Sequence, residues 1–114
     1  MEMTKISAME NATILALDGK LDMSGVNQID TKFKEEAALS DNVIVRMQKV
    51  SFLASMAMRM LMVAAKTLEK KSGKLILVGA GEEVESALRM AGLDLRIPLV
   101  ADDEAALEQL KINN

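Results

Sequence analysis

The sequence contains neither cysteine nor histidine. These two absences exclude disulfide bonds, thiol nucleophiles, imidazole acid–base catalysis and the usual zinc sites. Long apolar segments are also missing, because no run of about 18 apolar residues occurs and the first residues lead into no hydrophobic stretch. We therefore expect neither a signal peptide nor a membrane-spanning helix, and we expect a cytoplasmic protein.

An excess of positive charge is absent as well. The net charge is −3, which gives no electrostatic reason to expect nucleic acid as a partner. Half of the 114 residues are hydrophobic and 27% are charged, a composition that can bury a core, and the length fits one domain. We predict a single domain over residues 1–114. Four lysines, Lys66, Lys70, Lys71 and Lys74, are expected at a helix end, where cations interact favourably with the dipole.

Apolar periodicity divides the chain into alternating strands and helices. Strands are expected around Ile6 and over residues 13–17, 42–47, 74–78 and 97–100, with a hairpin turn at Glu10-Asn11 and with Asp18-Gly19 closing the second strand. Helices are expected after the candidate caps Asp22 and Ser24, from near Ser55 to Ser72-Gly73, over 82–90 and over 102–110.

The predicted buried stripes of the first two helices are Val26, Ile29, Phe33 and Ala37, and then Ala57, Leu61, Ala64, Ala65 and Leu68. Alternating strands and helices predict an α/β fold: a mainly parallel mixed sheet with an N-terminal antiparallel hairpin strand and helices packed on it.

Six short segments, in this order and spacing, resemble the STAS domain of anti-sigma factor antagonists. Gly19-Lys20-Leu21-Asp22 is similar to the family's Gly-Glu-Leu-Asp, and Val50-Ser51-Phe52-Leu53 is similar to its Val-Asp-Phe-Ile before the central helix. Residues 74–78 match its next strand. The segments 91–93, 97–99 and 104–107 resemble its Gly-Leu, Pro-Ile and Glu-Ala-Leu ending.

The resemblance implies a bacterial regulatory protein that controls transcription by partner switching on a sigma factor. Its implied partner is an anti-sigma factor or a histidine-kinase-like ATPase domain, and a homodimer is a further candidate. We expect no enzyme activity, no catalytic residue, no metal and no cofactor. A second interpretation keeps the fold and makes the chain a STAS subunit of a larger transport-associated or sensory scaffold complex.

One segment departs from the family pattern. The family's central helix opens with Asp-Ser-Ser-Gly, whose second serine is phosphorylated, whereas residues 54–57 read Ala-Ser-Met-Ala. Met56 has no hydroxyl to accept a phosphoryl group, and Ala54 lacks the neighbouring carboxylate. In the family the added phosphate, with a charge of about −1.5 to −2, abolishes partner binding. The resemblance therefore implies a chain locked in the binding state.

Two polar residues near this segment each have two interpretations. Ser55 either caps the central helix, which would contribute on the order of 1 kcal/mol, or is a displaced phosphorylation site at the positive helix end. Asp22 either caps the first long helix or, by the resemblance, lies close to the switch position.

Methionines alternate along the start of the central helix at Met56, Met58, Met60 and Met62, and they spread beyond its buried stripe. We predict that Met56, Met60 or both are exposed and contact the partner, with Arg59 at the polar edge. The alternative is that these methionines fill the core. The predicted partner-binding residues are Asp22, Ser55, Met56, Met58, Arg59 and Met60.

An enzyme or small-ligand protein that uses Asp22, Arg59, Glu82 and Glu83 is a third interpretation. It lacks support, because no spaced carboxylate pair or metal-binding cluster accompanies these residues.

Overall fold

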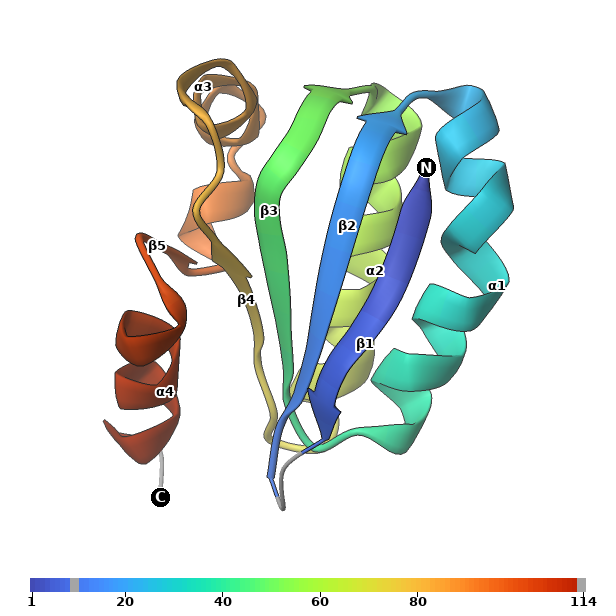
Figure 1. Cartoon of the computed structure of the whole chain (residues 1–114). Helices are drawn as coiled ribbons and strands as arrows, with labels where there is room; N and C mark the ends of the chain where they lie inside the picture. The colour runs from blue at the N-terminus through green and yellow to red at the C-terminus, as the bar shows by residue number, and fades with distance from the viewer. Residues whose placement is uncertain (9–10, 113–114) are drawn as a thin grey trace.

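A five-stranded sheet with strand order β1-β2-β3-β4-β5 organises the chain in the computed structural model, which describes residues 1–8 and 11–112 (Figure 1). The strands are β1 (Glu2–Ala8), β2 (Thr13–Leu21), β3 (Val43–Leu53), β4 (Leu75–Val78) and β5 (Leu99–Val100). The helices are α1 (Met23–Leu39), α2 (Ser55–Glu69), α3 (Glu82–Met90), the short 3-10 helix η1 (Leu93–Leu95) and α4 (Asp103–Ile112).

Strand β1 pairs with β2 in antiparallel fashion, and every other neighbouring pair is parallel. The predicted fold, a single α/β domain with a mixed sheet and an antiparallel N-terminal strand, is confirmed. The hairpin turn was predicted at Glu10-Asn11, of which Glu10 lies outside the described residues. No helix among the described residues has the length and hydrophobicity that a membrane crossing requires.

Helices cover the two faces of the sheet unequally. Helices α1 and α2 pack on one face, where the larger core cluster lies, and α4 packs on the other face over β3 and β4 (Figure 1). All predicted stripe residues of the first two helices are buried. Strand β3 is central, and its Ile44 and Val45 point into the two different clusters with no exposed surface.

Strands β2 and β3 run further than their sequences predicted. Asp18-Gly19 was expected to close β2, but the strand continues to Leu21, and β3 continues past residue 47 to Leu53. Gly19 has a φ of +125°, which favours glycine, and the register between β2 and β3 shifts on both sides of it. The expected end is therefore an irregularity inside a longer pair of strands.

The end of α2 was predicted near Ser72-Gly73, with glycine in the left-handed conformation. The helix does end near these residues, but Ser72 rather than Gly73 adopts the left-handed conformation, with a φ of +65°. The Ser72 N–H donates to the Glu69 carbonyl and the Gly73 N–H to the Leu68 carbonyl, a Schellman arrangement. Gly73 is required for a different reason: a Cβ there would lie 1.8 Å from the carbonyl oxygen of Asp41.

The lysine cluster at this end stabilises a different helix from the expected one. Lys71 Nζ donates to the carbonyls of Ala37, Ala38 and Ser40, at 2.9, 2.8 and 2.6 Å, which are at the carboxyl end of α1. Lys71 thus satisfies the open carbonyls of the neighbouring helix. Only Lys66 lies in the last turn of α2 itself.

The close approach at Gly73 predicts a position-specific loss of stability. Gly73→Ala should lower the free energy of unfolding by about 2 kcal/mol or more, because the clash is with backbone that cannot rotate away. Gly81→Ala is the matched control, since a Cβ at Gly81 meets nothing within 4 Å. It should change stability by less than about 1 kcal/mol. Urea denaturation of both variants measures the difference, and equal losses would contradict the assignment.

Candidate functional site

The carboxyl ends of β2 and β3 meet at one edge of the sheet. Leu21 and Leu53 are register partners, and the Ala54 N–H donates to the Leu21 carbonyl at 2.9 Å. This bond ties together the two loops that lead into α1 and α2. Helix α3 begins after β4 at the same edge (Figure 1). Loops at the carboxyl ends of parallel strands are where α/β proteins usually place their binding sites.

Asp22 is the N-cap of α1. Its carboxylate accepts from the Gly25 N–H at 2.8 Å, and its carbonyl accepts from the Val26 N–H at 2.9 Å. The capping interpretation of Asp22 is therefore confirmed. Gly25 permits the tight start of the helix, since a Cβ there would lie 2.0 Å from the Lys20 carbonyl oxygen. The first turn of α1 is thus pressed against the end of β2.

Ser55 is the first residue of α2, and Ala54 occupies the cap position with no side-chain cap. The prediction that Ser55 caps the helix is wrong, because a residue inside the first turn does not place its hydroxyl over the free N–H groups as an N-cap does. Ser55 is exposed, and within residues 1–8 and 11–112 its hydroxyl makes no hydrogen bond. The hydroxyl is accessible at the positive end of the helix.

The methionines of α2 divide between core and surface. The prediction that Met56, Met60 or both are exposed holds for Met56, which is 41% exposed, whereas Met60 is 4% exposed and belongs to the core. Met60 follows Ala57 by three residues, which places it in the buried stripe. Met58 is half-buried and packs against the core. Arg59 is exposed and forms no ion pair in the described part of the chain.

Two exposed apolar residues at this edge were not predicted. Met23, directly after the Asp22 cap, is 64% exposed, and Phe52, near the end of β3, is 50% exposed. Strict alternation from the buried Val50 would place Phe52 inside. The register shift between Gly19 and Lys20 instead buries Leu53 and leaves Phe52 outside. The exposure of Phe52 therefore follows from the pairing register of β2 with β3, and the sequence of either strand alone does not indicate it.

Phe52 also lines a shallow hollow of about 200 Å³ between the end of β3 and α3. The remaining lining residues are Ser51, Leu53, Glu83, Val84 and Ala87. Across the described chain no group of three or more His, Cys, Asp or Glu side chains could hold a metal ion. The edge therefore presents exposed apolar side chains, exposed serine hydroxyls that include that of Ser55, and the Arg59 guanidinium, which suit contact with another molecule.

Comparisons with known proteins point to one family. The family model of the STAS domain matches residues 3–106. SpoIIAA, an anti-sigma factor antagonist solved in its unphosphorylated form, has a TM-score of 0.81 and 20% identity, with 96% of each chain covered. An anti-sigma factor antagonist from Mycobacterium paratuberculosis has a TM-score of 0.83 and 20% identity, with 96% of this chain and 95% of that chain covered.

A murine anion transporter, Slc26a9, shares the fold over part of its length. Its TM-score is 0.70 at 18% identity, and the match covers 89% of this chain but 18% of the transporter chain. At these identities the solved structures establish the fold alone. No curated protein matched the sequence. The family model spans nearly the whole chain, and the order of strands and helices agrees with the fold of the solved members, so this chain belongs to the STAS domain family.

Proposed function

We propose that this STAS domain is a regulatory protein–protein interaction module that docks onto a protein partner through the carboxyl edge of β2 and β3. The observation that carries the proposal is that three exposed apolar side chains, Met23, Phe52 and Met56, lie on the segments that meet at that edge. Large exposed apolar groups beside polar ones are typical of interaction surfaces. The partner is an anti-sigma factor or a histidine-kinase-like ATPase domain, and the setting is sigma-factor control in the bacterial cytoplasm.

Each predicted contact residue has a distinct part in this surface. Met56 supplies apolar area at the start of α2, and Arg59, one turn on, supplies a charged edge. Met58 offers less area because it is half-buried, and Asp22 acts by fixing the start of α1 through its cap. Met60 is buried and therefore does not belong to this surface.

In the family, phosphorylation of a serine regulates partner binding, and regulation at this surface must work differently. Met56 stands where the phosphorylated serine is expected, so no phosphoryl group can be added at that position. Ser55, the residue directly before it, has an exposed hydroxyl at the positive helix end and is the acceptor that we propose. We propose that partner binding is constitutive unless Ser55 is modified.

A second candidate function is that of a STAS subunit in a larger transport-associated or sensory complex. The likeness to part of the Slc26a9 transporter supports it, since the same fold there makes up a fraction of a larger chain. A tagged chain used to capture proteins from a lysate of the source organism, with mass spectrometry of the recovered proteins, separates the two. A kinase-like ATPase supports the first function, and recovery of transporter subunits alone would replace it with the second.

Replacing Met56 with a charged residue should weaken partner binding and spare the fold. Binding can bury the exposed part of Met56, and Met56→Asp both removes this apolar area and places a carboxylate in the interface, so it should raise the dissociation constant for the captured partner by about tenfold or more. Its thermal midpoint should remain close to that of the wild type, because the side chain is already partly exposed. Isothermal titration and thermal melts measure both quantities.

Two control variants on the same helix sharpen this test. Val63 is 42% exposed, nearly the same as Met56, and lies two turns further along α2, so Val63→Asp should bind normally. Met60→Asp should instead lower stability by several kcal/mol, because it buries an unpaired carboxylate. Equal loss of binding in Met56→Asp and Val63→Asp would contradict a contact surface at the sheet edge.

The missing hydroxyl at position 56 predicts the phosphorylation pattern. Incubation with a histidine-kinase-like anti-sigma factor and ATP should leave the chain unmodified or modify Ser55 only, and Ser55→Ala should abolish any incorporation. Phosphopeptide mapping by mass spectrometry locates the phosphate. A phosphate on any other serine or threonine of the wild type would show that the switch lies elsewhere.

A further inference from the structure

Helix α4 is attached to the sheet by few contacts. Among its described side chains, Ala106 and Leu110 are buried and Leu107 is partly buried. Helices α1 and α2 each bury at least five residues. An isolated helix of ten residues is marginal in water, so α4 depends on the sheet for its structure. The preceding strand β5 adds only two residues of pairing with β4.

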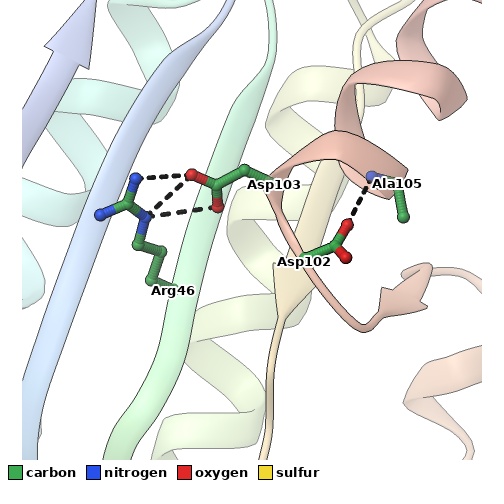
Figure 2. A network of polar contacts seen from close by, with 4 residues as sticks. All are labelled: Arg46, Asp102, Asp103 and Ala105. Carbon is green, nitrogen blue, oxygen red and sulfur yellow. Dashed lines mark hydrogen bonds and ion pairs between the residues drawn. The ribbon is translucent and has the colours of Figure 1, made fainter.

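A charged contact fixes the first residue of α4 to the middle of the sheet. Arg46 on β3 donates through Nη2 and Nε to Asp103 Oδ2, at 2.5 and 3.1 Å, and through Nε to Oδ1 at 3.3 Å (Figure 2). Such two-pronged arginine–carboxylate pairs are stronger than single charged contacts. The hydrogen bond to Asp103 also raises the pKa of Arg46. The contact joins residues that are 57 positions apart in the chain.

The neighbouring acid has a separate task. Asp102 Oδ1 accepts from the Ala105 N–H at 2.8 Å, which caps the first turn of α4 (Figure 2). This cap is internal to the helix segment and does not involve the sheet. The start of α4 therefore remains capped whether or not Asp103 is paired with Arg46.

An apolar strip lies under α4, and an open hollow lies beside it. Ile14, Ile44 and Ile76 are buried in the cluster that α4 covers. Next to them, a hollow of about 800 Å³ opens over β1, β2 and β3, with the half-exposed Ile6 and the small Ala16 in its lining. Arg46 and Asp103 line the same hollow, so the ion pair stands between the covered and the open part of this face.

We propose that α4 opens from the sheet as a unit while the rest of the domain stays folded, and that the Arg46–Asp103 ion pair is the latch that sets how often it opens. Opening uncovers the isoleucine strip and joins it to the hollow. Helix α4 and this ion pair lie on the face opposite α1 and α2, and the proposed opening does not depend on the proposed docking edge.

Hydrogen–deuterium exchange of the full chain, followed by mass spectrometry, tests the latch. In the wild type the α4 amides should exchange faster than those of β3, which report global unfolding. Arg46→Ala and Asp103→Asn should each speed α4 exchange by about three- to tenfold, with β3 and α2 unchanged. The double variant should be no faster than either single variant, because the two side chains form one interaction.

Lys111→Ala is the matched control, since it removes an exposed ion pair with Glu108 that lies within α4. It should leave α4 exchange unchanged. Equal protection of α4 and β3 in the wild type would overturn the proposal, and so would an Arg46→Ala variant in which α4 exchange does not rise or rises only in step with β3. If Arg46→Ala fails to fold, Asp103→Asn applies the same test from the helix side.

Discussion

Parallel pairing of β2, β3 and β4 is the constraint on which the rest of the molecule depends. Their apolar side chains fill both faces of the central strands, so the three strands cannot shift independently. Parallel strands require crossover helices, and each crossover starts at the same edge. The starts of α1, α2 and α3 therefore gather there, and the Ala54–Leu21 hydrogen bond fixes two of them to each other.

Residue periodicity predicts the parts of this structure that depend on a single element. The buried stripes of α1 and α2, the Asp22 cap and the span of α3 follow from spacing within one segment. The errors arise where two segments decide the outcome. Pairing with β2 extends β3, the register shift turns Phe52 outward, and the approach of the Asp41 carbonyl fixes Gly73 while Ser72 takes the left-handed turn.

The same distinction between one segment and two applies to the candidate site. Met56 and Arg59 lie off the buried stripe of α2, so helical spacing alone indicates their exposure. Spacing did not decide whether Met60 is exposed as well, because the wide apolar arc obscures where the stripe ends. The exposure of Met23 and Phe52 depends on how the elements meet at the folded edge, so spacing within one element does not predict it. Under the proposed function, Met56 takes the place of the family's phosphorylated serine, and binding at this edge then rests on buried apolar area rather than on a reversible charge.

The central claim is that a protein partner sits on the carboxyl edge around Met56. Site-specific photo-crosslinking in cells of the source organism tests it most directly, with a benzophenone amino acid placed in turn at Met56, Val63 and Ile6. These three positions have nearly equal exposure and lie on the edge, on the flank of α2 and on the opposite sheet face. The account predicts a discrete crosslinked partner from position 56 and none from 63 or 6. A partner captured from 63 or 6 but not from 56 would contradict it.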